Sequence, residues 1–203
     1  MVVIGISGSY GGLNTGDEAI LTSMLASLRG ARPGQPDEFV VFSRNADHTA
    51  AHHRVDRVVP TRDLNRDQVL AEIERLDLLL LGGGGILYNG EARVYLRDVR
   101  LAQEREVPTF AYAVGVGPLD DAEDRDLVRT TLERMAGVTV RDEVSRRVLA
   151  RRPRATRRCH RGSRVAARTG RLSSGATRPR ERDRGATVGR DVRARAGEGG
   201  FRP

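Results

Sequence analysis

Glycines gather in three short stretches of the chain, each placed where an apolar run ends. The stretches are GSYGGLNTGDE from Gly8, LLLLGGGGIL from Leu78 and AVGVGPL from Ala113. Glycine lets backbone N–H groups turn toward a ligand, and the N-terminus of a following helix favours an anion such as phosphate or carboxylate. The pattern predicts a site for a small anionic molecule at the ends of three strands.

The first stretch also carries polar side chains that suit ligand binding. Asn14 comes just before a predicted helix start, where a left-handed conformation and a ligand contact are equally open interpretations. Asp17 follows at the same end of the helix, so we take Asn14 and Asp17 as candidate binding residues. Thr15 and Glu18 have the spacing of a capping box, which accounts for Glu18 without a ligand.

The second and third stretches offer bare backbone. Four consecutive glycines cost about 1 kcal/mol each in regular structure relative to alanine, so we expect a loop and exclude a strand interior. The loop is either a tight turn or a surface against which a substrate lies, and we favour the substrate. For the third stretch taken alone, we favour a plain strand-to-helix turn. The candidates from these stretches are Gly83, Gly84, Gly85, Gly115 and Gly117.

Arg141 ends the apolar run VTV and precedes Asp142, which is suited to cap the next helix. At a strand end the guanidinium can hold an anionic group through two hydrogen bonds, or it can form an ion pair within the protein. The cluster of His48, His52 and His53 comes with no cysteine or carboxylate pattern, so we expect a polar loop there and no metal. No residue is singled out as catalytic.

Apolar runs and helical patterns alternate along residues 1–150, which predicts an α/β fold with a doubly wound parallel sheet. A helix is expected from Gly16 to a stop at Gly30. The other predicted helices are Asp67–Leu76, Ala92–Arg105, Ala122–Met135 and Asp142–Ala150. The predicted strands are Val2–Ser7, Phe39–Phe42, Val55–Val59, Leu78–Leu81, Thr109–Val114 and Val138–Val140.

Charge divides the 203 residues into two parts. All 35 basic residues are arginine, and residues 151–203 hold 17 of them with only 4 acids, whereas residues 1–150 hold 18 with 23 acids. With so little apolar content, we predict that residues 151–203 form a disordered basic tail. Its charge would attract phosphate, but Phe201 is its single aromatic residue, so specific nucleic-acid recognition is not expected.

Cys159 is the only cysteine, so no internal disulfide is expected. The chain shows neither a secretory pattern at its start nor an apolar stretch long enough to cross a membrane. We therefore expect a soluble, cytoplasmic protein without a transmembrane segment.

Four stretches in order, GGLNTGDEAIL, LLLLGGGGIL, AVGVGPL and AGVTVRDEVS, resemble the polysaccharide pyruvyl transferase family over about residues 3–150. The resemblance implies the N-terminal half of a two-domain fold like that of glycosyltransferase-B enzymes. It implies phosphoenolpyruvate as donor substrate, no further cofactor, and a saccharide or lipid-linked saccharide acceptor. The implied product is a pyruvate ketal on a cell-wall or exopolysaccharide sugar.

The sequence departs from the family pattern in three ways. The Arg-Leu-His motif of the family's C-terminal domain is missing, and Val114 stands where family members usually have glutamine. After about Arg151 the arginine-, glycine- and proline-rich sequence is typical of a GC-rich gene read out of frame, so we expect a frameshifted, truncated and inactive half. The alternatives are a nucleotide-sugar glycosyltransferase of the same fold class and a non-enzymatic fragment with a basic tail.

Overall fold

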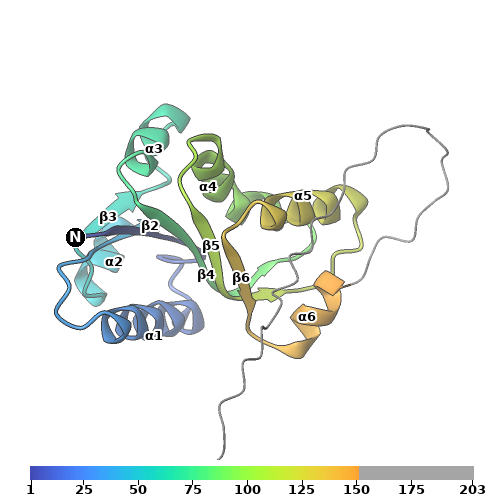
Figure 1. Ribbon diagram of the computed structural model, residues 1–203, viewed down its shortest axis with the longest axis horizontal. Coiled ribbons are helices and arrows are strands. Elements are labelled where there is room, and N and C mark those ends of the chain that lie inside the picture. The colour runs from blue at the N-terminus through green and yellow to red at the C-terminus, as the bar shows by residue number, and fades with distance from the viewer. Residues whose placement is uncertain (151–203) are drawn as a thin grey trace, which may run out of the picture. The chain divides into compact units, whose positions relative to one another are not determined.

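The computed structural model describes residues 1–150, in which strands and helices alternate in the predicted α/β order (Figure 1). The strands are β1 (Val3–Ser7), β2 (Glu38–Ser43), β3 (Arg57–Pro60), β4 (Leu78–Leu87), β5 (Thr109–Val116) and β6 (Gly137–Val140). The helices are α1 (Thr15–Ala31), α2 (Ala46–His52), α3 (Arg66–Ile73), α4 (Ala92–Glu104), α5 (Ala122–Glu133) and α6 (Glu143–Ala150).

All strands of the sheet are parallel, in the order β3-β2-β1-β4-β5-β6. The chain builds outward from β1 to β3 and then returns to the other side of β1 with β4. The strand order therefore reverses between β1 and β4, where Ser7 pairs with Leu81. In open sheets of this kind, ligands bind beyond the carboxyl ends of the strands at such a switch point. The predicted doubly wound parallel sheet is confirmed.

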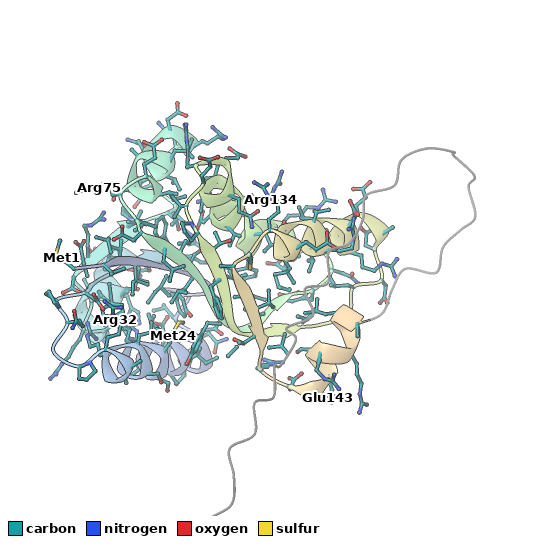
Figure 2. All side chains as sticks on the ribbon, viewed as in Figure 1. Met1, Met24, Arg32, Arg75, Arg134 and Glu143 are labelled. Carbon is teal, nitrogen blue, oxygen red and sulfur yellow. The ribbon has the colours of Figure 1, made fainter. Side chains whose placement is uncertain are left out.

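Two apolar cores cover the two faces of the sheet. On one face Ile6 and Leu80 pack with Leu21 and Met24 of α1, and Met24 lies between this helix and the sheet in Figure 2. On the other face Leu79 and the alternate strand residues pack against α3, α4 and α5. Because both faces are covered, the strands read as continuous apolar runs. Burial of each large apolar side chain contributes about 1.5–3 kcal/mol to folding.

The prediction of a polar loop around the histidines was wrong, because this segment forms α2. Asn45 accepts a hydrogen bond from the backbone N–H of His48 at 3.0 Å and caps the helix. The buried Thr49 hydroxyl bonds to that of Ser43 at 2.7 Å and anchors α2 to the end of β2. The helix is short and mostly polar, so it lacks the apolar period that revealed the other helices.

The predictions for residues 151–203, namely the disordered basic tail and the frameshifted end, fall outside the residues that the structure describes. Within residues 1–150, no helix is both long and apolar enough to span a membrane. The boundary between the two predicted regions stays a prediction.

Candidate functional site

The glycine loop after β1 is tied to the end of β2. Gly11 has a φ of +71°, a conformation that side-chain-bearing residues rarely adopt, and an added Cβ would meet the hydroxyl of Ser43. The backbone N–H of Arg44 donates to the carbonyl of Tyr10 at 3.1 Å. The loop is thereby held across the carboxyl ends of β1 and β2.

Asn14 proves to be the N-cap of α1. Its backbone is extended, with φ −85° and ψ 111°, and its side chain accepts a hydrogen bond from the N–H of Gly16 at 3.0 Å. The left-handed residue is the preceding Leu13, with φ 62°, so the left-handed interpretation of Asn14 was wrong. The predicted capping box is also wrong, because Asn14 rather than Thr15 caps the helix.

The glycine run from Gly82 to Gly85 lies inside β4, so the prediction that excluded a strand interior was wrong. Tyr10 and Met24 lie where a side chain on Gly82 would stand, and Ile20 of α1 lies 2.8 Å from a Cβ built on Gly83. The missing side chains therefore let α1 and its loop pack closely on the strand. This close packing offsets the backbone cost of the glycines. Gly83 is buried beneath α1 and not open to a ligand; Gly84 and Gly115 are buried as well, whereas Gly85 is exposed.

Five of the predicted residues come together at the carboxyl ends of β4 and β5, and we call them the glycine rim. Asp17 of α1 approaches Gly84, whose φ is +89°, with its Oδ1 atom 3.0 Å from an added Cβ. A Cβ added to Gly115 would lie 2.7 Å from the Gly84 carbonyl oxygen. The absence of a side chain at Gly115 therefore lets β4 and β5 lie close together here. The rim consists of Asp17, Gly84, Gly85, Gly115 and Arg141.

The Arg141 side chain lies over the backbone of two rim glycines. A Cβ on Gly115 would be 2.7 Å from its Nε and Cζ atoms, and one on Gly85 would be 3.5 Å from Nη1. Arg141 also donates to the Asp142 carboxylate at 3.0 Å, so the ion-pair interpretation holds. The Arg141 side chain is still 51% exposed, and its guanidinium has further N–H donors that can bind an anion.

Asp142 fixes the start of α6 next to this guanidinium. Its carboxylate accepts from the Ser145 N–H at 2.7 Å, as predicted for an N-cap. Hydrogen bonds from the backbone and side chain of Ser145, followed by Arg141, lower the pKa of Asp142 below its usual range. The Ser145 hydroxyl accepts from the Val116 N–H at 2.9 Å and locks α6 to β5.

Gly117 and Val114 lie outside the rim. A Cβ on Gly117 would stand 2.9 Å from Tyr88, the residue that follows β4. Burial, followed by the charge of Glu91, raises the pKa of Tyr88. Val114 is fully buried in the core, so the position where family members usually carry glutamine supplies no polar contact here.

A cavity of about 660 Å³ opens at the carboxyl ends of β1 and β2 and beside the segment that follows β3. Sequence reasoning missed it. We call it the arginine cavity; its lining includes Ser7, Arg44, Arg62, Tyr95, Arg97 and Asp98. Arg93 and Glu91 line it too, so four arginines face two carboxylates and the lining is net positive.

Salt bridges occupy two of these arginines. Arg97 donates to Asp98 at 3.0 Å, and Asp98 accepts from the buried Ser7 hydroxyl at 2.9 Å. Arg93 pairs with Glu123 and Asp124 of α5. Within residues 1–150, Arg44 and Arg62 form no ion pair.

One signal in the sequence pointed to the arginine cavity. Arg44 and Arg62 follow the apolar runs that became β2 and β3, as Arg141 follows the run that became β6. Arg44 and Arg62 therefore stand at strand ends in the same way as Arg141, at the edge of the sheet where ligands bind.

Glu18 and His53 form a second polar contact that sequence reasoning missed. The Glu18 carboxylate accepts from the Gly11 N–H at 3.0 Å and lies 2.7 Å from His53 Nε2. The His53 side chain is 4% exposed, and its Nδ1 atom lies 3.2 Å from the Thr22 hydroxyl. Glu18 therefore joins the glycine loop to the end of α2.

The Tyr10 hydroxyl is buried and has no hydrogen-bond partner among the described residues. Burial, followed by the charges of Asp17 and Glu18, raises the pKa of Tyr10. The ring fills the space left by Gly8 and Gly82. Tyr10 packs beneath the loop and does not project into the arginine cavity.

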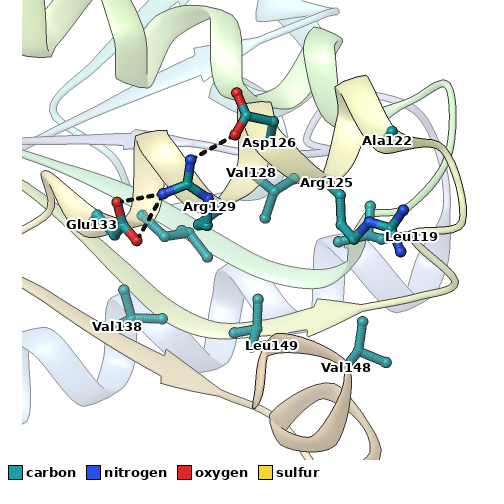
Figure 3. Close-up of a pocket in the computed structure, with 11 residues that line it drawn as sticks. Leu119, Ala122, Arg125, Asp126, Val128, Arg129, Glu133, Val138, Val148 and Leu149 are labelled. Atoms are coloured by element: carbon teal, nitrogen blue, oxygen red, sulfur yellow. Dashed lines mark hydrogen bonds and ion pairs between the residues drawn. The ribbon is translucent and has the colours of Figure 1, made fainter. Parts of the chain in front are cut away.

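A further pocket of about 410 Å³ lies between α5, β6 and α6 (Figure 3). Val138, Val148 and Leu149 face α5 across it, and Arg129 bridges Asp126 and Glu133 at its margin. This pocket is mostly apolar and lies beside the edge strand rather than at the switch point. We therefore place the candidate site at the rim and the arginine cavity.

Across residues 1–150 no three histidine, cysteine or acidic side chains are placed to hold a metal ion. The site combines arginines, hydroxyls and backbone groups with the carboxylates of Asp17, Glu91 and Asp98. This donor set fits an anionic organic ligand better than a metal ion.

A doubly wound parallel sheet with an arginine-lined cavity at its carboxyl edge defines an α/β protein of the open parallel-sheet class, in which ligands bind at the switch point. A family model described as polysaccharide pyruvyl transferase matches residues 14–152. The chain belongs to the polysaccharide pyruvyl transferase family. A search of curated proteins found no match.

Proposed function

We propose that the protein acts in pyruvyl transfer from phosphoenolpyruvate to a saccharide, with the glycine rim as the donor-facing wall. The reaction protonates the donor's methylene carbon, joins a sugar hydroxyl oxygen to C2, releases phosphate and closes the ketal with a second hydroxyl. Two hydroxyl protons leave the sugar; one is balanced by the new methyl group and one by the released phosphate. No resident cofactor is required.

The observation that carries the proposal is the half-exposed Arg141 guanidinium, which lies over the buried Gly115 and beside the exposed backbone of Gly85. A carboxylate or phosphate that binds at Gly85 would meet this cation. Charge-assisted, bidentate hydrogen bonds of this type are among the strongest in proteins. Asp17 at the opposite side of the rim would orient the donor through repulsion of its anionic groups.

The remaining predicted residues have supporting roles in this proposal. Asn14 holds the start of α1, Gly83 lets α1 approach β4, and Gly117 makes room for Tyr88. The chain has no Arg-Leu-His motif, so we propose that it binds donor without completing transfer by itself. The acceptor as a cell-wall, exopolysaccharide or lipid-linked sugar and the cytoplasmic location stay predictions.

Donor binding to the full chain and to two matched variants tests the proposal. Phosphoenolpyruvate is expected to raise the melting temperature of the wild-type protein, and Arg141→Gln to weaken binding by about tenfold. Arg147→Gln is the control, because Arg147 is an exposed arginine on α6 that pairs with Glu143. Equal affinity of both variants, or stabilisation by a nucleotide sugar and not by phosphoenolpyruvate, would contradict the proposal.

A further inference from the structure

We propose that the arginine cavity binds the phosphoryl group of a phosphorylated saccharide, which is the acceptor side of the reaction. The acceptor assignment rests on the proposed function. The cavity belongs to a different part of the sheet edge from the rim, so the two substrates occupy separate subsites.

The Arg44 guanidinium is positioned by Tyr95 so that it can bind an anion. It donates to the Tyr95 hydroxyl at 2.9 Å and lies 5.3 Å from the centre of the Tyr95 ring. The Tyr95 hydroxyl donates in turn to Ser9 at 3.3 Å. Stacking on an aromatic ring fixes the plane of the guanidinium and leaves most of its five N–H donors for a ligand.

Arg62 supplies a second cation from another strand. It follows β3, it is exposed, and it forms no ion pair with any residue of 1–150. Unpaired arginines at two neighbouring strand ends suit the several oxygens of a phosphoryl group. Arg97 is unsuited to this role because Asp98 neutralises it.

The size and lining of the cavity favour a saccharide attached to the phosphate. Its volume of about 660 Å³ exceeds what a three-carbon donor fills and falls within the usual range for larger ligands. Beside the arginines, Glu91 offers a carboxylate and Thr61 a hydroxyl, both of which can bond to sugar hydroxyls. Leu64 and Val94 add apolar surface.

The two subsites lie on opposite sides of the sheet's carboxyl edge. Tyr95 and Asp98 come from α4, whose core residues pack on one face, whereas Asp17 comes from α1, which packs on the other. Both regions border the switch point between β1 and β4. A donor at the rim and a phosphosugar in the cavity would therefore approach the same edge from its two sides.

The test measures binding of glucose 1-phosphate, glucose, inorganic phosphate and phosphoenolpyruvate to the full chain by calorimetry. The variants are Arg44→Gln, Arg62→Gln and Arg141→Gln. Arg125→Gln is the matched control, since Arg125 is exposed on α5 and lines only the edge pocket of Figure 3. Melting temperatures show whether each variant folds, and Arg62 serves as the second probe because its exposed side chain supports little packing.

We expect glucose 1-phosphate to bind more tightly than glucose or inorganic phosphate. Arg44→Gln and Arg62→Gln should each weaken it about tenfold, whereas Arg125→Gln and Arg141→Gln should not. Unchanged affinity in both cavity variants, or no binding of glucose 1-phosphate at all, would overturn the inference. Phosphoenolpyruvate binding that depends on Arg44 and not on Arg141 would also overturn it, because the cavity would then hold the donor.

The two proposals fail separately. If wild-type protein binds glucose 1-phosphate through Arg44 but does not bind phosphoenolpyruvate, the phosphosugar site stands and the donor proposal falls. If phosphoenolpyruvate binding depends on Arg141, and the affinity for glucose 1-phosphate does not depend on Arg44 or Arg62, the donor proposal stands and the cavity inference falls.

Discussion

The glycine rim and the arginine cavity lie at the same edge of one sheet, yet they are built in opposite ways. At the rim, missing side chains leave Gly85 exposed and let the Arg141 side chain lie against Gly85 and the buried Gly115. At the cavity, long side chains converge around an open space of about 660 Å³. The rim should therefore be sensitive to added atoms, whereas the cavity should be sensitive to lost charge and lost hydrogen bonds.

The largest effect is expected from an added side chain at the rim. Gly115→Val would place Cβ 2.7 Å from the Gly84 carbonyl oxygen, and backbone cannot move aside as a flexible side chain can. We expect a loss of about 3 kcal/mol in the free energy of unfolding, together with loss of phosphoenolpyruvate binding. Chemical denaturation measures the stability.

Gly12→Ala is the control for this change, since its Cβ would have 3.6 Å to the nearest atom. It should shift stability by less than about 0.5 kcal/mol. If Gly115→Val were as stable as Gly12→Ala, the rim would not be the closely packed surface described above.

The second-largest effect is expected from the Glu18 contact, which joins the glycine loop after β1 to the end of α2. Glu18→Ala would leave the Gly11 N–H and the Nε2 atom of His53 without their partner, at a cost of about 2 kcal/mol. A double-mutant cycle with His53→Ala should give a coupling of about 1 kcal/mol. Additive effects of the two substitutions would show that the contact contributes nothing to stability.

A pair of tyrosines contrasts the two regions directly. The Tyr10 hydroxyl is buried without a partner, so Tyr10→Phe should raise the free energy of unfolding by about 1 kcal/mol. The Tyr95 hydroxyl bonds to Arg44 and Ser9, so Tyr95→Phe should lower it by about 1 kcal/mol. Thermal melts of both variants measure this difference, and changes of the same sign would contradict it.

The smallest effect is a dependence on acid pH, carried by one carboxylate in each region. The Gly90 N–H, followed by Arg93, lowers the pKa of Asp124 behind the cavity, and Ser145 lowers that of Asp142 at the rim. A lowered folded-state pKa stabilises the protein above the unfolded pKa, about 4 for aspartate, and this stability is lost as pH falls through the folded value.

Asp124→Asn and Asp142→Asn should therefore each flatten the fall in melting temperature below about pH 4. Asp47, an exposed acid on α2 without an ion pair among the described residues, supplies the control variant Asp47→Asn. A wild-type pH profile in both aspartate variants would show that neither carboxylate is linked to folding.

The alternation of apolar runs and amphipathic helices was enough to predict the sheet and five of the six helices within residues 1–150. The helix α2 was not predicted, because it is stabilised by the N-cap Asn45 and by the hydrogen bond of Thr49 to Ser43 rather than by an apolar face. The extent of β4 was misjudged because a glycine's local cost says nothing of the helix that packs upon it. Local sequence patterns indicate the hydrophobic period and the turn residues. They do not show which side chain from a distant helix fills the space beside a glycine.

The candidate site was predicted in part for the same reason. Asp17, Gly84 and Arg141 were found because each follows or faces a strand end, and they do meet at one rim. The arginine cavity required the order of the strands, since only the pairing of β1 with both β2 and β4 brings Arg44 beside Tyr95. An arginine at the end of a predicted strand does not by itself indicate which helix residues will lie beside it in the fold.

Residue order alone determined the parallel α/β class of this protein and its family, because hydrophobic period and glycine placement are local and repeat along the chain. Tertiary structure decided which glycines are open, which arginines are neutralised and where a cavity remains. These outcomes depend on contacts between residues far apart in sequence, and such contacts exist only after the sheet has assembled.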